Sequence, residues 1–264
     1  MSVVLYFVIP CYNDSDTLPV SAPVFKAKLG SLIRREKASP DSRLVFVDDG
    51  SSDGTFSYLR GMCESDKGII ALKLDGNYGE QNAILAGTEY AYNKGAEAVV
   101  SIDSDLQENI NAVDGMLDKL NEGCDIALGV RSARGGDTKT ERFMSSAFYT
   151  LNGAFKTGLV KEHSNYRMMN RKAIAELLTH KGETYFLPAL ASGLNGKKAF
   201  VSFERKSRAA GESRYNFKSK LRLAALSICC HTERKPVKAV IDKFNIKEKL
   251  NFKAEYRIEE ACGE

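Results

Sequence analysis

The sequence predicts an α/β fold, built on a mostly parallel sheet with helices on both faces. Short apolar segments of strand length alternate with helix-like segments through roughly the first 130 residues. Polar clusters follow four of the apolar segments, where the carboxyl ends of parallel strands would gather a binding site. No internal repeat or low-complexity linker interrupts this order. Such alternation is typical of parallel strands connected by helices.

The elements of this part can be assigned in chain order. Apolar runs predict strands at 3–9, 43–47, 69–74, 98–102 and 125–128. Between them, helices are expected at 23–35, 55–63, 79–93 and 110–120. In the third of these helices, Ile84, Gly87, Thr88 and Ala91 share one face. The pattern therefore predicts a Rossmann-like sheet.

Beyond residue 129 the alternation is weaker. We expect a mobile loop at 131–142, helices at 143–155 and 173–178, strands at 166–169 and 199–203, and a flexible turn at 209–213. The tail from Glu233 carries eight basic and seven acidic residues, and no element or function is assigned to it.

A final helix is expected near 217–230. Its apolar stripe consists of Phe217, Leu221, Ala224, Ala225 and Ile228, with Lys218, Lys220 and Arg222 beside the stripe. Periodicity leaves two interpretations open. The helix either lies in a membrane interface or packs on the sheet as an ordinary amphipathic helix.

Composition narrows the function classes. The 264 residues are 43% hydrophobic and 27% charged, which is ordinary for a globular protein. A net charge of +4 is too small to predict nucleic-acid binding. The segment 197–222, however, has nine basic and two acidic residues, which favours an anionic partner in the C-terminal third.

Cysteine and hydropathy patterns point to an intracellular chain. The six cysteines form no C-x-x-C pair and there are only three histidines, so a structural zinc site and a disulfide scaffold are both disfavoured. The N-terminus lacks the features of a signal peptide, and no apolar window reaches eighteen residues. We expect a cytoplasmic protein without a transmembrane span.

Two acids end the strand at 98–102. Asp103 and Asp105 are two residues apart, so in extended chain both carboxylates face the same side and can bind one divalent cation. Gln107 adds an amide oxygen at the next alternate position. An isolated D-x-D pair is more often a solvated turn, and the cation interpretation depends on the other strand-end clusters.

Those clusters suit a nucleotide. After the first strand, Tyr12 offers a stacking surface and Asp14 an acceptor for ribose or base donors. In the second cluster, 47–55, Asp53 is expected to cap the next helix, and Asp48 or Asp49 to contact the nucleotide. The third cluster, 76–82, opens a helix, whose N-terminus favours an anion.

The sequence resembles the inverting family 2 glycosyltransferases, in the branch of dolichyl-phosphate-mannose synthases and bacterial undecaprenyl-phosphate (bactoprenol) glucosyltransferases. The resemblance covers about residues 3–230. It rests on V-I-P-C-Y-N at 8–13, V-D-D-G-S-S-D-G-T at 47–55, G-N-Y-G-E-Q-N-A at 76–83, D-S-D-L-Q at 103–107, G-V-R at 129–131, Y-R-M-M at 166–169 and R-A-A-G-E-S-R-Y at 208–215. The last element and the L-Q extension of D-x-D are the narrower signals.

The resemblance implies a GT-A fold, a donor site, a metal site and an acceptor site. The donor nucleotide-sugar would contact Pro10, Tyr12, Asp14, Val47, Asp48, Asp49, Ser104, Arg131, Arg208 and Arg214. Mg²⁺ or Mn²⁺ would be held by Asp103, Asp105 and Gln107, and an acceptor phosphate by Arg131, Arg134 and Ser213. Catalysis would rest on Asp103, Asp105, Arg131 and Arg208. Guanidinium groups suit bidentate phosphate binding.

The implied activity is transfer of a hexose from a UDP- or GDP-sugar to a polyprenyl phosphate. Many relatives have an aspartate where this chain has Asn165, and an amide cannot take up a proton. A phosphate acceptor is already anionic and needs no strong base, whereas a hydroxyl acceptor would need one. His163 is the nearest substitute base.

The resemblance also suggests a division of the chain and leaves rival functions open. We expect a catalytic domain at 1–216, with a nucleotide-binding half at about 1–130 and an acceptor half at about 131–216, followed by a helix and charged tail at 217–264. Attachment would be peripheral, on the inner membrane face. Alternatives are a hydroxyl acceptor in surface polysaccharide synthesis and a non-catalytic nucleotide-sugar binding module. A nucleotidyltransferase is disfavoured because no Gly-rich basic loop follows the first strand.

Overall fold

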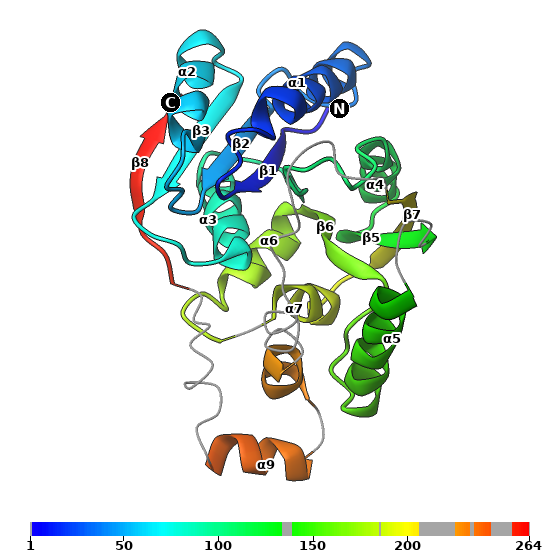
Figure 1. The fold of residues 1–264 in the computed structure, drawn as a ribbon. Coiled ribbons are helices and arrows are strands. Elements are labelled where there is room, and N and C mark those ends of the chain that lie inside the picture. Colours follow the sequence, from blue (N-terminus) through cyan, green and yellow to red (C-terminus); the bar gives the residue numbers. More distant parts are fainter. Residues whose placement is uncertain are drawn as a thin grey trace.

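The computed structural model describes residues 2–133, 139–184, 186–205, 225–232, 235–243 and 255–263, which form one eight-stranded sheet with helices on both faces (Figure 1). The strand order is β7-β5-β6-β4-β1-β2-β3-β8. The strands are β1 (Leu5–Cys11), β2 (Arg43–Asp48), β3 (Ile69–Leu74), β4 (Ala98–Ser101), β5 (Ile126–Ala133), β6 (His163–Asn170), β7 (Lys198–Glu204) and β8 (Ile258–Cys262).

The sheet is mostly parallel, as predicted. β1 pairs in parallel with β2 and β4, β2 with β3, and β5 with β7. Only β6 and β8 run against their neighbours. The helices are α1 (Leu18–Arg34), α2 (Thr55–Ser65), α3 (Glu80–Asn93), α4 (Ala112–Asn121), α5 (Lys139–Ala154), α6 (Arg171–Leu178), α7 (Leu187–Gly193) and α9 (Lys235–Lys243), and residues 225–231 are also helical.

Alternating side chains of the central strands feed two apolar cores. In β1, Phe7 and Ile9 pack in a cluster with side chains of α1, α2 and α4, whereas Tyr6 and Val8 pack in a second cluster with α3, α6 and α7. This period of two is what a strand buried on both faces requires. At one point the layers are very close, because a Cβ on Gly87 of α3 would lie 2.5 Å from Val8 Cγ1. The cores fix β1 at the centre of the molecule.

The predicted loop at 131–142 is wrong at both of its described ends. β5 continues to Ala133, paired with β7, and α5 begins at Lys139. The polar composition of this stretch concealed the pairing, since a strand held by backbone hydrogen bonds needs no apolar run. The first helix also begins earlier than expected, at Leu18, and contains Pro23. Helices α7 and α9 were not anticipated, and the turn expected at 209–213 lies outside the described residues.

Strand β8 comes from the tail to which no element was assigned. It pairs antiparallel with β3 and forms an edge of the sheet. Its outward residues are charged: Glu260 accepts two hydrogen bonds from Arg60, at 2.5 and 2.6 Å, and Glu259 pairs with Lys73 at 2.7 Å. Charged side chains on an edge strand also discourage pairing with other chains. The proposed domain division at 216 stays a prediction, but this tail strand belongs to the same sheet as β1 to β7.

The described part of the expected C-terminal helix, 225–231, is packed rather than free. Leu226 is fully buried with Phe186 and Ala189, and Ser227 donates to Asn152 of α5 at 2.5 Å. Phe217, Leu221 and Ala224 lie outside the described residues. Across the described residues, no helix is both long and apolar enough to cross a membrane.

Candidate active site

The loops after β1 and β4 meet at the carboxyl edge of the sheet. β1 lies between β4 and β2 in the sheet. After β1 the chain continues to β2 and β3 on one side, and it then crosses to β4 on the other side. Ser104 Oγ donates to Asp14 Oδ2 at 2.8 Å, which joins the loop of Asp103 and Asp105 to the loop of Tyr12. Open α/β sheets bind ligands at such a reversal of strand order. The predicted cation and nucleotide segments therefore share one site.

The loop after β2 is tied to the same place. Asp14 N donates to Thr55 Oγ1 at 2.7 Å, and Asn13 Oδ1 accepts from Ser52 N at 2.9 Å. Gly54, not Asp53, occupies the N-cap position of α2, although Asp53 Oδ1 accepts from Thr55 N at 3.0 Å. The capping contact expected of Asp53 is thus made one position before the N-cap.

Asp49 orders the loop after β3. Its carboxylate accepts from Tyr78 N at 2.7 Å and from Gly79 N at 2.8 Å, at the start of α3. Gly50 has φ +69°, and a Cβ there would lie 2.5 Å from the carbonyl carbon of Gly76. Burial raises the pKa of Asp49 to about 6, against the opposing effect of the two backbone donors. Asp49 therefore shapes the predicted anion-binding segment, 76–82, through backbone contacts.

Asp48 is the second acid of this loop and is fully buried. Its Oδ1 accepts from Ser51 Oγ, whereas Oδ2 has no hydrogen-bond partner among the described residues. Burial raises its pKa. An unpartnered buried oxygen is costly unless a ligand supplies a donor or a charge.

A cluster of acids surrounds Asp103. Burial is the main cause that raises the pKa of Asp103 well above its usual value, followed by the charges of Glu108 and Glu80. Glu80, the first residue of α3, also forms a hydrogen bond with Asp103. Asp103 Oδ1 and Glu108 Oε2 have no hydrogen-bond partner within the described part of the chain. Such a concentration of buried acid is stabilised by nearby positive charge.

Arg131 supplies part of that charge. It lies near the end of β5, and its charge lowers the pKa of Glu108, although burial dominates and the net shift is upward. Arg131 Nε is buried and has no hydrogen-bond partner in the described residues. A half-buried guanidinium whose buried Nε is an unused donor beside buried acids suits a phosphate ligand.

The predicted ligands fit a divalent cation that substrate completes. In the described residues, no three acidic, histidine or cysteine side chains are grouped so as to hold a metal ion. Mg²⁺ commonly uses one or two carboxylates and takes its other ligands from phosphate and water. The unpartnered Asp103 Oδ1 and the neighbouring Asp105 match that requirement. Gln107 differs, because its Oε1 accepts from Arg205, and its role as a ligand stays a prediction.

Asn165 lies beside this cluster and is held from both sides. Its Nδ2 donates to Glu80 Oε1, and its Oδ1 accepts from Arg167 Nη2 at 3.0 Å. Arg167 is fully buried in β6 and also donates to the carbonyl of Leu187 at 3.2 Å. Contacts thus run from Arg167 through Asn165 and Glu80 to Asp103.

His163 is a poor candidate for a base. Burial, followed by the charge of Arg167, lowers its pKa to about 3. Its Nδ1 lies 3.1 Å from the carbonyl of Gly129, which assigns the imidazole proton to Nδ1. A neutral imidazole of such low basicity does not accept a proton readily near neutral pH, so His163 has a packing role here.

The other predicted site residues are distributed as follows. Pro10 and Val47 are register partners in β1 and β2, and Tyr12 is half-buried just beyond β1. Arg134, Arg208, Ser213 and Arg214 lie outside the described residues. Sequence reasoning missed Glu80, Glu108, Arg167 and Arg205. Of these, only Glu80 gave a signal in the sequence, because it is an acidic residue within the predicted anion-binding segment, 76–82.

Comparison with known families decides the assignment. The model of glycosyl transferase family 2 matches residues 6–178, which run from β1 to the end of α6. The chain belongs to glycosyltransferase family 2. The matched segment includes Asp14, Asp49, Asp103 and Asp105 of the site described above.

Curated relatives agree with the family. This family 2 chain is 34% identical over 221 residues to the uncharacterized glycosyltransferase YkoT of Bacillus subtilis (strain 168), covering 84% of this chain and 65% of YkoT. It is 27% identical over 210 residues to the prophage bactoprenol glucosyl transferase homolog of Escherichia coli (strain K12), covering 79% and 66%. The chain thus spans slightly less than two thirds of the length of these relatives.

Solved structures confirm the GT-A fold of this family 2 chain. Glucosyl-3-phosphoglycerate synthase from Mycobacterium tuberculosis, in complex with phosphoglyceric acid, aligns with a TM-score of 0.56 at 15% identity, over 88% of this chain and 82% of the synthase. The same enzyme in complex with Mn²⁺, UDP-glucose and phosphoglyceric acid gives a TM-score of 0.53 at 14% identity, over 86% and 78%.

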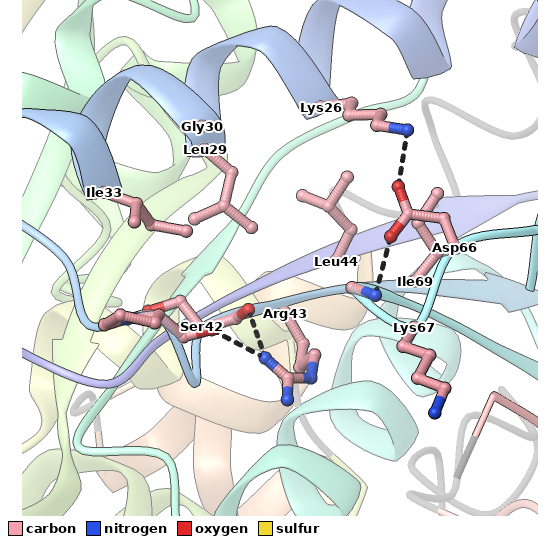
Figure 2. Close-up of a pocket in the computed structure, with 12 residues that line it drawn as sticks. Lys26, Leu29, Gly30, Ile33, Ser42, Arg43, Leu44, Asp66, Lys67 and Ile69 are labelled. Atoms are coloured by element: carbon pink, nitrogen blue, oxygen red, sulfur yellow. Dashed lines mark hydrogen bonds and ion pairs between the residues drawn. The ribbon is translucent and has the colours of Figure 1, made fainter.

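A cavity of about 350 Å³ lies away from the site (Figure 2). Its lining includes Arg43 and Ile69, the first residues of β2 and β3, so it lies at the amino edge of the sheet. At its rim Lys26 pairs with Asp66 at 2.5 Å. It therefore does not contribute to the cluster of loops at the carboxyl edge.

Proposed function

We propose that the chain is a metal-dependent inverting glycosyltransferase that moves a hexose from a UDP- or GDP-sugar to a polyprenyl phosphate. The observation that carries the proposal is the hydrogen bond from Ser104 to Asp14. It holds the loop of Asp103 and Asp105 against the loop of Tyr12 and Asp14. Three carboxylate oxygens have no hydrogen-bond partner among the described residues, on Asp103 and Glu108 after β4 and on Asp48 at the end of β2. They suit a ligand that arrives with a cation and with hydrogen-bond donors.

The relatives support the lipid and the cation. The Escherichia coli relative is named for bactoprenol, a polyprenyl carrier, and the mycobacterial enzyme was solved with Mn²⁺ and UDP-glucose. These names favour a nucleotide-sugar donor, Mg²⁺ or Mn²⁺, and an acceptor that is already anionic.

The residues divide the work by charge. Asp103 and Asp105 would hold the cation, with Gln107 as the further ligand implied by the family. Bound there, the cation would neutralise charge on the leaving nucleoside diphosphate. Arg131 would contact phosphate through the donor that is unused in this structure. Asp14, Asp48 and Asp49 would orient the nucleotide or the loops that bind it.

No strong base is needed for this reaction. The acceptor phosphate oxygen attacks the anomeric carbon on the face opposite the leaving diphosphate, which inverts that centre. Such an oxygen is already anionic near neutral pH. The site agrees, since Asn165 is an amide that Glu80 and Arg167 hold in place, and His163 has a pKa of about 3.

We further propose that the chain works at the cytoplasmic membrane face as a peripheral protein. The balance of +7 over 197–222 would favour anionic lipid. Flotation with liposomes measures this directly. Binding to anionic liposomes that weakens with salt supports attachment, and complete absence of binding rejects it.

The deciding experiment combines donor and acceptor. Purified protein with Mn²⁺ is incubated with labelled UDP- and GDP-hexoses and a polyprenyl phosphate, and the labelled lipid is extracted. The proposal expects a labelled lipid that requires Mn²⁺ or Mg²⁺ and is lost in Asp105→Asn. Transfer only to a soluble glycan would show a hydroxyl acceptor instead. Donor binding without any transfer would show a binding module.

A further inference from the structure

Two cysteines that are far apart in the sequence meet at the edge of the sheet. Cys63 lies near the end of α2, and Cys262 is the last residue of β8. The Cys63 thiol is hydrogen-bonded to the Cys262 side chain and also contacts the backbone of Ala71. Ala71 of β3 is the register partner of Cys262, and Cys262 packs against the core cluster that contains both Ala71 and Cys63, so the fold places the two cysteine side chains side by side.

The two thiols differ in exposure. Cys63 is 5% exposed within the core formed with α1, α2 and α4, whereas Cys262 is half-buried and packs on that core from the edge strand. Burial, followed by the neighbouring Cys262, raises the pKa of the Cys63 thiol. An external reagent therefore meets Cys262 first, and Cys63 is placed to react second.

The backbone at this edge is fitted closely. Gly263 has φ +91°, and a Cβ there would lie 2.2 Å from the carbonyl oxygen of Ile69. At the other end of β8, the Arg257 carbonyl accepts from Asp75 N at 3.1 Å, just before the segment 76–79 that Asp49 orders. β8 thus extends from the two cysteines to the residues next to segment 76–79.

We propose that Cys63 and Cys262 are a disulfide-forming pair that fastens β8 to α2 and β3. The oxidant is a small-molecule disulfide such as oxidised glutathione. Hydrogen-bonded sulfur atoms must approach to about 2 Å to form the bond. Cys262 is the half-buried residue of the pair and ends the edge strand, so a change of its side-chain rotamer can bring the two sulfur atoms closer.

The reaction balances as two thiol–disulfide exchanges. The Cys262 thiolate attacks the small disulfide, forms a mixed disulfide and releases one small thiol. The Cys63 thiolate then attacks the Cys262 sulfur, which forms the protein disulfide and releases the second small thiol. Two protein thiols lose two electrons and two protons in all, and the reagent is reduced to two thiols. The second step is the slower one, because Cys63 ionises with difficulty.

The test compares the purified full chain before and after treatment with oxidised glutathione. We expect a peptide that joins Cys63 to Cys262 in a non-reducing digest. Closing a loop of about 200 residues should raise Tm on the order of 10 °C. Dithiothreitol should remove both the linked peptide and the rise in Tm.

Matched variants separate this pair from the other cysteines. Cys262→Ser changes the half-buried partner and should abolish the rise in Tm, as should Cys63→Ser. Cys124→Ser, at another buried cysteine, should keep it. The proposal is overturned if the mapped bond joins other cysteines, if Cys262 stops at the glutathione adduct, or if the linked protein shows no rise in Tm.

Discussion

Carboxylates in two regions of this molecule have opposite surroundings. Asp114, in the first turn of α4, is paired with Lys28 and with Arg35 at 2.5 Å, and Asp118 is paired with Lys37 at 2.7 Å. These pairs join α4 to α1 and to the residues that follow it. At the carboxyl edge of the sheet, Asp103 and Glu108 instead keep an oxygen without a hydrogen-bond partner among the described residues.

The pKa values of Asp103 and Asp114 are shifted in opposite directions, and the presence of basic partners at Asp114 alone explains the difference. Burial raises the pKa of both Asp103 and Asp114, but hydrogen bonds from Lys28 and Arg35 outweigh it at Asp114 and lower that pKa overall. Asp103 has acids for neighbours and no such compensation. An arrangement that stabilises the fold pairs its charges, whereas one that awaits a ligand leaves them unpaired. The contrast supports the placement of the proposed site at the carboxyl edge of the sheet.

Neutralising Asp103 should have the largest effect on activity. Asp103→Asn should lower the transferase activity at least about 100-fold, about 3 kcal/mol in the activation free energy, because the variant loses a predicted cation ligand. The folded state should be as stable or more stable, since a buried charge without compensation is removed. Steady-state rates and urea unfolding measure the two effects. Loss of both activity and stability would show that Asp103 is a structural residue.

The pH dependence of Asp49 is the next largest effect. Its pKa of about 6 in the folded protein is above the ordinary 3.8, so the folded state binds the proton more tightly. Its contribution is therefore complete below about pH 4 and is lost as the pH rises through 6, by about 3 kcal/mol at most. Asp49→Asn cannot ionise. Relative to the wild type, its free energy of unfolding should increase between pH 4 and 7.

Urea unfolding at several pH values measures this difference. Asn keeps only one acceptor for the two N–H groups of Tyr78 and Gly79, so the variant starts at a disadvantage. That disadvantage is the same at every pH. A free-energy difference that does not change between pH 4 and 7 would mean that Asp49 is not buried with a raised pKa.

Asn165 tests the connection between the buried network and the acids. Asn165→Asp should cost about 2 kcal/mol of unfolding free energy, because a carboxylate would replace the amide N–H that Glu80 accepts from. The new acid should also make the cluster around Asp103 more negative, so the stabilisation by Mn²⁺ should increase. Thermal shifts with and without Mn²⁺ measure both effects. If the apo variant matches the wild type, the contact between Asn165 and Glu80 is not important for stability.

Local patterns predicted the central strands well. β3 occupies the range expected from its apolar run, 69–74, and Asp14 and Asp103 lie at the ends of predicted strands. What failed depends on partners distant in sequence. β8 is held by pairing with β3 and by Arg60, neither of which leaves a pattern in its own residues. Arg167 can be fully buried because Asn165 and Leu187 accept its hydrogen bonds. From the sequence alone, an arginine is expected at the surface.

The site was predictable to the same degree. The position of each acid after a strand follows from the sequence, but burial and the company of other acids do not. Glu80 becomes a neighbour of Asp103 only when α3 packs on the sheet, whereas Glu108 follows Asp103 in the same loop and gives no sign in the sequence that it will be buried. The carboxylates of the α1–α4 contact look the same in the sequence and function differently because lysine and arginine reach them.

The smallest expected effect is at the paired end of the comparison. Asp114→Asn should leave activity within about twofold, because among the described residues the salt bridges of Asp114 go to Lys28 and Arg35 and not to the loops at the carboxyl edge. It should lower the free energy of unfolding by about 1 kcal/mol near pH 7, since Lys28, whose side chain is 8% exposed, loses its charged partner. Because the pKa of Asp114 is lowered in the folded state, this contribution exists above the ordinary value of 3.8 and is lost as the pH falls. The free energies of unfolding of Asp114→Asn and the wild type should therefore become equal in acid. In acid, Asp49→Asn should differ from the wild type only by the cost of its lost acceptor, which does not depend on pH. Between acid and neutral pH, the stability relative to the wild type should fall for Asp114→Asn and rise for Asp49→Asn. A change in the same direction for both would remove the distinction between an acid paired with cations and a buried acid that the described residues do not pair with a cation.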